Sequence, residues 1–381
     1  MAHPAPHSGT GQREPYVDWL RAFSLIVVVL WHWVFTIIHW TPNGPLPTTP
    51  LAYYHAVWIL TWVLQVVPLF FYVGGYVHLL SWEHARERGE HTGRYLWTHL
   101  KQLLVPGLSV VAVWVAVGAV VGAVFKVGWI FNTVLLIISP LWFLGMYVAL
   151  LALLPAAIWL HRRFGVLVLV WLAGIAVCAD VLRLSWGVWW AGWINMVAVW
   201  GLAYEAGFHY RRLADAPRRY GFVVLWGGLF ALVGLVFSGL YPGSMVGVPG
   251  DRLSNMSPPT VVIVALLAFQ IGLAQVLRPA VERGLARPHW RRLNEVINTY
   301  ALPLYLFHST GMALWLMCVY GLYTHHLSDD RPPDLIWWAE RPLAIAGPLL
   351  FTVPLILLFG RRLIHRNIPR NVPRNTEGKT R

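Results

Sequence analysis

The segment LRAFSLIVVVLWHWVF, residues 20–35, is apolar enough to lie in a membrane, yet it carries Arg21 and His32. It belongs to an apolar run over 22–40, and runs of about 17 to 25 residues can cross a bilayer as helices. Similar runs follow along the chain. The sequence therefore predicts an all-α, polytopic membrane helix bundle with about ten transmembrane helices. The predicted helices cover residues 22–40, 56–80, 103–125, 140–160, 164–182, 187–208, 221–240, 259–277, 296–320 and 342–360.

The composition supports a membrane protein and excludes an ordinary soluble domain. Hydrophobic residues make up 57% of the 381 residues and charged residues only 12%, whereas about a quarter of a soluble domain is charged. The mean hydropathy is +0.57. The 23 Trp and 15 Tyr residues suit the aromatic belts at the two surfaces of a bilayer.

The distribution of basic residues predicts the orientation of the bundle. If the N-terminus is cytoplasmic, 24 of the 29 Lys and Arg residues fall in cytoplasmic segments, as the positive-inside rule requires. We therefore expect a multi-pass protein of the inner (plasma) membrane with both termini cytoplasmic. The net charge of +13 is spread over segments that each meet anionic headgroups, which favours membrane lipids as partners and not nucleic acid.

The chain divides into one long membrane domain and two polar ends. We expect a polar N-terminal segment over 1–12, a membrane domain over 13–362 and a disordered basic cytoplasmic tail over 363–381. The short apolar segment 130–139 is predicted to be re-entrant or interfacial. The Gly- and Pro-rich loop 241–259 is either a binding loop or a solvated connector.

Arg21 and His32 lie on one face of the first predicted helix. Eleven residues separate them, which corresponds to about three turns and about 16 Å along the axis. His39 follows seven residues later and points nearly the same way, so a polar stripe is predicted from the inner surface toward the outer one. Ionisable side chains within a membrane normally face a bundle interior or a water-filled cavity.

Two interpretations stay open for the residues of this stripe. A neutral His32 near mid-bilayer can accept a proton from a hydroxyl, as a general base does, or it can form an interhelical hydrogen bond that only stabilises the bundle. Asp18 lies three residues before Arg21, so the two side chains are neighbours. The pair is either an ordinary surface ion pair or a device that orients Arg21 toward an anionic ligand.

The remaining candidate residues have simpler interpretations. Glu205 is expected to form an ion pair with Arg211 or Arg212 near the inner end of its helix. Cys178 and Cys318 lie in apolar runs, so we expect small buried residues rather than disulfide or metal ligands. No metal site is predicted.

The segment REPYVDWLRAFSLIVVVLWHWVF resembles the first helix of the acyltransferase-3 family of integral membrane O-acyltransferases. In that family an Arg is followed, after ten residues, by a His to which the catalytic role is assigned, and Arg21 and His32 match this pattern. Later motifs resemble the family in order and spacing, and the resemblance covers about residues 13 to 360. These motifs are VPLFFYVGGYVHLLSW with Pro68, Phe70, Phe71 and Gly75, PLWFLGMYVALLALLP with Trp142, Phe143 and Leu144, and LPLYLFHS with His308.

The sequence departs from the family pattern after the second helix, where two Arg residues three apart often precede a Pro. Here the stretch is YLWTHLKQLLVP, with Lys101 near the expected place and Arg94 seven residues upstream. Lys keeps the charge but lacks the bidentate fork of Arg. The resemblance implies that Arg21, Arg94 and Lys101 line a cytoplasmic mouth, where they pair with the phosphates of CoA.

The resemblance implies an enzyme that moves an acetyl or other short acyl group from cytoplasmic acyl-CoA, its co-substrate, to a hydroxyl. The acceptor is expected to be an extracytoplasmic glycan or glycolipid of the cell envelope, and the use of 26 Arg against 3 Lys is typical of a GC-rich bacterial genome. The implied catalytic residues are His32, Arg21, Asp18 and His308. His32 acts as a base or carries the acyl group, and His308 either handles a second proton or is simply packed.

Two other functions stay open at this point. Arg21, His32 and His39 can also form the proton relay of a proton-coupled transporter, although the sequence contains no internal repeat of the kind that many transporters show. The departure at Lys101 also leaves a non-catalytic scaffold with a degenerate site as an alternative.

Overall fold

The computed structural model describes residues 14–41, 44–126, 128–322 and 332–360. In this part of the chain, nine helical stretches are long and apolar enough to cross a membrane, so the protein is a multi-pass helical membrane protein. The predicted polar segment 1–12 and basic tail 363–381 lie outside the described residues. The nine stretches are Pro15–Phe35, Ala56–Glu87, Thr92–Phe125, Ile130–Ala152, Leu167–Ser185, Arg218–Phe237, Val261–Leu285, Ala301–Val319 and Arg341–Gly360.

The elements are mostly helices, with one short antiparallel sheet. The α-helices are α1 (Pro15–Phe35), α2 (Thr61–Leu64), α3 (Val67–Glu87), α4 (Thr92–Phe125), α5 (Ile130–Ile138), α6 (Trp142–Ala152), α7 (Leu154–Phe164), α8 (Leu167–Ser185), α9 (Ile194–Phe208), α10 (Tyr210–Ala214), α11 (Arg218–Phe237), α12 (Val261–Leu285), α13 (Pro288–Thr299), α14 (Ala301–Leu322), α15 (Leu335–Ala339) and α16 (Arg341–Leu355). The strands are β1 (Ile37–Thr41) and β2 (Gly44–Thr48), and the tighter or wider helical turns are η1 (Pro50–Ala52), η2 (His55–Leu60), η3 (Ser139–Leu141), η4 (Trp189–Trp193) and η5 (Ile356–Gly360).

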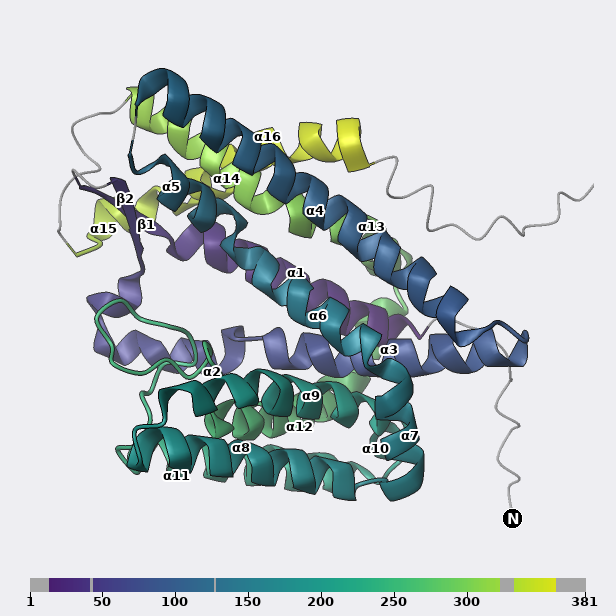
Figure 1. The fold of residues 1–381 in the computed structure, drawn as a ribbon. Helices are drawn as coiled ribbons and strands as arrows, with labels where there is room; N and C mark the ends of the chain where they lie inside the picture. Colours follow the sequence, from purple (N-terminus) through teal and green to yellow (C-terminus); the bar gives the residue numbers. More distant parts are fainter. Residues whose placement is uncertain (1–13, 42–43, 127, 323–331, 361–381) are drawn as a thin grey trace, which may run out of the picture.

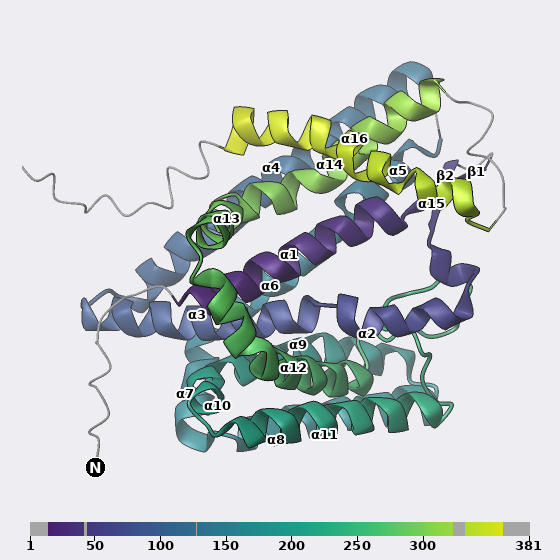
Figure 2. The same ribbon diagram turned by 180° about the vertical axis from the view of Figure 1, so that it is seen from behind.

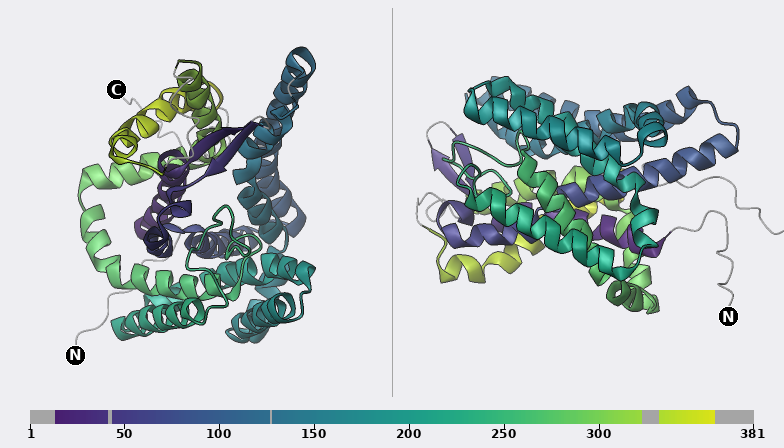
Figure 3. Two further views of the ribbon diagram at one scale, coloured as in Figure 1. Left: turned by 90° about the vertical axis from the view of Figure 1, so that its left-hand side faces the viewer. Right: turned by 90° about the horizontal axis from the view of Figure 1, so that it is seen from below.

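Helix α3 runs through the middle of the bundle, between two groups of helices (Figures 1 and 2). On one side lie α9 and α12, with α8 and α11 farther out, and on the other side lies α1, followed by α14 and α16. Figure 3 shows α1, drawn in purple, among helices from later parts of the chain. Because α1 packs against α3, α12, α13, α14 and α16, its polar side chains can be shielded from lipid.

Two glycines allow α3 and α9 to pack closely. A Cβ atom on Gly75 would overlap the backbone carbonyl of Tyr204, and a Cβ atom on Gly207 would overlap the backbone carbonyl of Tyr72. Small residues at such positions let membrane helices approach until their backbones touch, which strengthens van der Waals packing where lipid leaves no hydrophobic driving force.

The first helix ends earlier than predicted, at Phe35. Thr36 is already extended, with φ −78° and ψ 126°, and the next residues form β1, which pairs with β2. His39 therefore lies on a strand, and the prediction that it continues the polar stripe of the helix is wrong. The β-branched and aromatic residues of β1 favour a strand, and Pro45 and Pro47 in β2 could not extend a helix.

The middle of the chain also differs from the prediction. Segment 130–139 is the first part of a stretch long enough to cross a membrane, Ile130–Ala152, rather than a separate re-entrant piece. Helix α7 then begins with Pro155 in its first turn, where the missing N–H of proline is tolerated. The predicted helix 187–208 contains η4, and α9 itself has only 15 residues, fewer than a perpendicular crossing needs.

Loop 241–259 is folded against the end of the bundle, so its interpretation as a solvated connector is wrong. Met245 and Asn255 are fully buried. The backbone N–H of Met245 donates to Thr61 Oγ1 at 2.9 Å, and Asn255 Nδ2 donates to the carbonyl of Pro242 at 2.7 Å. The binding-loop interpretation stays a prediction.

The two cysteines are free, as expected, but both are exposed at the surface of the bundle. The prediction that Cys178 and Cys318 are buried is therefore wrong. The outer face of a membrane helix meets lipid, which is as apolar as a protein core, so hydropathy alone does not distinguish the two locations.

Candidate active site

Helix α1 carries Arg21 near one end and His32 near the other, on the same face, as predicted. The Arg21 guanidinium is held by two partners: its Nε donates to Asn298 Oδ1 at 2.8 Å, and its Nη2 lies 3.8 Å from Asp18 Oδ1. The nearer partner is therefore an amide of α13, not the carboxylate of α1. The Arg21 side chain keeps 30% of its surface exposed, so an anion can still reach it.

Asn298 is a site residue that the sequence reasoning missed. Its Nδ2 donates to the backbone carbonyl of Asp18 at 2.8 Å and to that of Asn294 at 2.9 Å, while Asn294 Nδ2 donates to the carbonyl of Pro15 at 3.1 Å. These bonds hold the first turns of α1 against α13. The signal in the sequence was two Asn residues four apart, a spacing that places both on one face of a helix.

The structure brings His32 and His308 together. His308 Nε2, on α14, lies 3.1 Å from His32 Nδ1, although 276 residues separate them in the chain. His308 is 1% exposed, whereas His32 is only partly buried. The ring that a substrate can reach is therefore that of His32, and the ring behind it is that of His308.

The backbone carbonyl of Tyr305 determines which ring nitrogens of this pair carry protons. The backbone carbonyl of Tyr305 lies 2.6 Å from His308 Nδ1, and a carbonyl can only accept, so Nδ1 carries the proton. In a neutral imidazole the other nitrogen is then an acceptor, so His308 Nε2 accepts from His32 Nδ1–H. For two neutral rings this leaves the lone pair of His32 on Nε2. Ser309 Oγ, 3.2 Å from His308 Nε2, is a second donor to the same acceptor.

The surroundings of the pair are largely apolar. Leu25, Val29, Leu144 and Leu306 belong to one buried cluster beside it, and Trp33 Nε1 donates to the backbone carbonyl of His308 at 3.0 Å. A hydrogen bond in such a low-dielectric setting is electrostatically stronger than one in water. The two rings are therefore well suited to hold a defined tautomer.

A third histidine, His78 on α3, was also missed. It is buried, its Nδ1 lies 2.7 Å from the hydroxyl of Tyr204, and it is within electrostatic reach of Arg21 and His99. His99 Nδ1 donates to the carbonyl of Tyr95 at 2.8 Å. In the sequence His78 stands out only as an isolated imidazole inside the apolar helix that follows Pro68.

The structure does not bring Arg94 and Lys101 into contact with Arg21. Both lie on α4 and are exposed, and no hydrogen bond or ion pair joins either of them to Arg21 among the described residues. The start of α4 nevertheless lies at the same end of the bundle as the start of α1 (Figure 1). The three charges therefore share one end of the molecule without forming one cluster.

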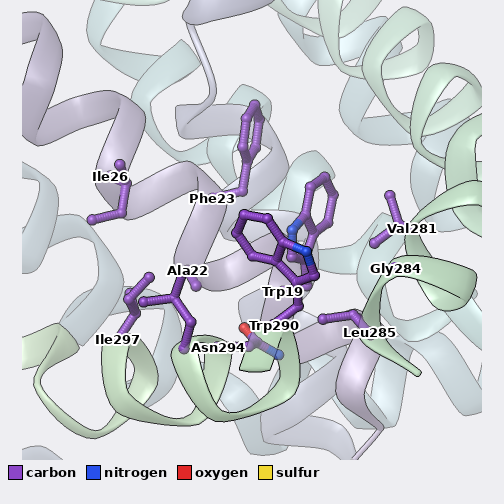
Figure 4. Close-up of a pocket in the computed structure, with 11 residues that line it drawn as sticks. Trp19, Ala22, Phe23, Ile26, Val281, Gly284, Leu285, Trp290, Asn294 and Ile297 are labelled. Carbon is purple, nitrogen blue, oxygen red and sulfur yellow. The ribbon is translucent and has the colours of Figure 1, made fainter. Parts of the chain in front are cut away.

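An apolar groove lies beside the start of α1 but is separate from the histidine pair. It has a volume of about 310 Å³, and its lining includes Trp19, Phe23 and Ile26 of α1 and Trp290 of α13 (Figure 4). At about 100° per residue, these α1 residues occupy a different face from Arg21 and His32. The groove therefore does not lead to the two imidazoles.

The region of the chain that matches a known family contains all of these elements. Residues 14–359 match the family described as an acyltransferase domain, Acyl_transf_3. No curated protein and no solved structure matches the chain. The matched region begins just before α1 and reaches η5, so it includes the histidine pair and the Arg21 site.

Proposed function

The chain belongs to this acyltransferase family, and on that premise we propose that it is a membrane O-acyltransferase that uses acyl-CoA. The acyl group is an acetyl or other short acyl group, and the acceptor is a hydroxyl of an extracytoplasmic glycan or glycolipid. Membership in this family disfavours the transporter alternative.

The observation that carries the proposal is the 3.1 Å contact between His32 and His308. The lone pair on His32 Nε2 takes the proton of the acceptor hydroxyl as its oxygen attacks the thioester carbonyl. The new C–O bond forms, the C–S bond breaks, and CoA leaves as a thiolate that takes the proton back from the imidazolium. His308 does not touch the substrate in this scheme. It is a positioning residue that keeps the proton of His32 on Nδ1.

Arg21 supports the donor side of the proposal. Its guanidinium is held by Asn298 at 2.8 Å, about three turns from His32 along α1. A fixed guanidinium suits a phosphate, because it offers parallel donors to two oxygens. Arg94 and Lys101, exposed at the same end, add positive charge that attracts CoA from the cytoplasm.

The orientation in the membrane follows from the charge bias. We infer that the end carrying Arg21 faces the cytoplasm, because the basic loops cluster there. Acyl-CoA is too polar to cross lipid, so it enters at this end. The acceptor then approaches from the opposite end, where β1, β2 and loop 241–259 lie (Figure 1).

The experiment uses sealed proteoliposomes in which the orientation of the protein is known. Acyl-CoA carrying a labelled acyl group is added to one face and a glycan or glycolipid acceptor to the other. We expect transfer when acyl-CoA is supplied to the Arg21 face, and none when it is supplied to the opposite face. The His32→Ala variant, reconstituted in the same way, is the control for uncatalysed transfer.

Each other outcome rejects a defined part of the proposal. Transfer that needs both substrates on the Arg21 face would keep the acyltransferase but reject the two-sided site. If labelled acyl-CoA or acceptor crosses unmodified and in step with protons, the protein is a transporter. No transfer from acyl-CoA in any arrangement, by protein that elutes as a single species, would reject acyl-CoA as the donor.

A further inference from the structure

The junction between α7 and α9 brings together three side chains with metal-binding atoms. His161 lies in the last turn of α7, Glu205 in the last turn of α9, and His209 directly after α9. One ligand atom of each lies within 4.8 Å of those of the other two. This group is on the far side of α3 from α1 (Figure 1), so it is separate from the histidine pair described above.

The contacts of Glu205 differ from the predicted ones. The expected ion pair with Arg211 or Arg212 is not formed: Glu205 Oε1 accepts from His161 Nδ1 at 2.7 Å and lies 3.8 Å from His209 Nε2. Arg211 Nε instead donates to the hydroxyl of Tyr76 at 3.1 Å. The carboxylate therefore faces two imidazoles rather than a guanidinium.

Two buried atoms of this cluster are left without hydrogen bonds. Glu205 is 2% exposed, and neither its Oε2 nor His209 Nε2 has a hydrogen-bond partner among the described residues. A buried carboxylate oxygen without a partner costs free energy, and buried charges in proteins are normally paired or bound to a metal. Both unpartnered atoms belong to the same group of three side chains, so one cation between them would satisfy both.

The spacing of the residues is suitable for a single ion. Glu205 and His209 are four residues apart, so they lie one turn apart on one face, and His161 approaches from a different helix. Phe208, beside them, packs edge-on against the His161 ring at 5.3 Å between centroids. This contact restricts the orientation of one imidazole.

We propose that His161, Glu205 and His209 bind one Zn²⁺ ion, with a fourth position left for water. Two imidazoles and one carboxylate are a zinc ligand set found in proteins, whereas Mg²⁺ and Ca²⁺ prefer oxygen ligands alone. The bound ion displaces the proton of His161 Nδ1, since a metal ligand must be deprotonated. The hydrogen bond between His161 Nδ1 and Glu205 Oε1, 2.7 Å long in this structure, gives way to shared coordination, because two ligand atoms about 2.0 Å from a tetrahedral ion lie about 3.3 Å apart.

The consequence for the protein is a cross-link between α7 and α9. The nearby guanidinium of Arg212, which interacts electrostatically with His209, weakens the attraction of the site for a cation. Loss of one of the three ligands should reduce the affinity for Zn²⁺ more than about a hundredfold. Loss of even a side chain that only supports a ligand costs about ten- to a hundredfold.

The test measures metal content in the full-length protein, purified in detergent through a tag that contains no histidine run. The protein is incubated with Zn²⁺, dialysed, and assayed by inductively coupled plasma mass spectrometry. We expect about one Zn²⁺ per chain in the wild type and in the control His289→Gln, which changes an exposed histidine on α13 outside the cluster. Glu205→Gln and His209→Gln should each lose the ion under the same dialysis.

A second measurement covers the case in which a variant fails to fold. Co²⁺ is titrated into the wild-type protein, and its visible absorption reports whether a four-coordinate site forms. Intense bands at one equivalent, removed by adding Zn²⁺, support the proposal even if the variants aggregate. Absence of both stoichiometric Zn²⁺ and four-coordinate Co²⁺ in the wild type overturns it, and so does equal Zn²⁺ content in the wild type and a folded Glu205→Gln protein.

Discussion

At the scale of single residues, the proposed chemistry depends on which nitrogens of two imidazoles carry protons. The carbonyl of Tyr305 holds a proton on His308 Nδ1. His308 Nε2 is then an acceptor, which in turn holds a proton on His32 Nδ1. Neither histidine alone defines a base, because either nitrogen of a neutral imidazole can carry the proton.

Replacing His32 should abolish acyl transfer. In His32→Ala no lone pair faces the acceptor hydroxyl, and general-base catalysis is worth about a hundredfold or more. The rate of acyl transfer is measured with purified protein, next to His289→Ala as an exposed histidine control. A His32→Ala rate above about a tenth of wild type would remove His32 from the role of base.

Replacing His308 should lower kcat without changing the KM for acyl-CoA. His308→Leu removes the acceptor of the His32 proton, and a misplaced catalytic group can cost about a hundredfold. His308→Gln should recover part of the loss, because its amide oxygen can still accept from His32 Nδ1. A purely structural role would instead lower the unfolding temperature of both variants and leave the kcat of the folded fraction unchanged.

Replacing Arg21 should weaken acyl-CoA binding. Arg21→Ala removes a guanidinium that Asn298 holds in place, and Arg21→Lys should restore affinity only in part, since a point charge replaces a bidentate fork. The dissociation constant for acyl-CoA is measured in nanodiscs for both variants. Unchanged affinity in Arg21→Ala would assign Arg21 to the support of α1 and α13 instead.

At the scale of elements, the packing of α3 against α9 helps to set the positions of both histidine sites. α3 contacts α1 on one side and α9 on the other. It therefore packs against one helix of the histidine pair and against one helix of the cluster of His161, Glu205 and His209. Close contact of α3 and α9 depends on Gly75 and Gly207.

A methyl group at this interface should destabilise the bundle. In Gly207→Ala the new Cβ meets the backbone of α3, and overpacking of this kind costs about 1–3 kcal/mol. Gly201→Ala is the matched control on the same helix, because a Cβ there has open space and alanine favours the helix by up to about 1 kcal/mol. The unfolding temperature in detergent should fall for Gly207→Ala only. Equal shifts for the two variants would contradict the close approach.

At the scale of the whole molecule, the two ends of the bundle differ in character. One end carries the start of α1, the start of α4 and the end of α7 with most of the basic loops, and the other carries the small sheet and the packed loop 241–259 (Figure 1). This difference fits the proposed entry of a charged donor at one end and of the acceptor at the other.

The orientation can be checked by cysteine labelling on intact cells. In a background with Cys178→Ser and Cys318→Ser, we expect Arg252→Cys to react with a membrane-impermeant maleimide. Glu87→Cys should react only after the membrane is permeabilised, because its loop is predicted to be cytoplasmic. Both positions are exposed, so a reversed pattern would show that the N-terminus is outside.

The sequence by itself determined the class of the protein and the face of α1. Hydropathy and the 3.6-residue period are properties of neighbouring residues, so they predicted a multi-pass helical bundle and the shared face of Arg21 and His32. The order and spacing of short motifs, and not these periodic properties, indicated the family. They failed at His39, because the hydropathy of the segment is compatible with both a helix and a strand. Only the backbone geometry after Phe35 showed the difference.

Only the tertiary structure decided which side chains meet. It placed His308 against His32 across 276 residues, Asn298 against Arg21 across 277, and His161 rather than an arginine against Glu205 across 44. Each of these contacts depends on how one helix is rotated and shifted against another. That geometry is set by the packing of many side chains at once, and no local pattern in the chain records it.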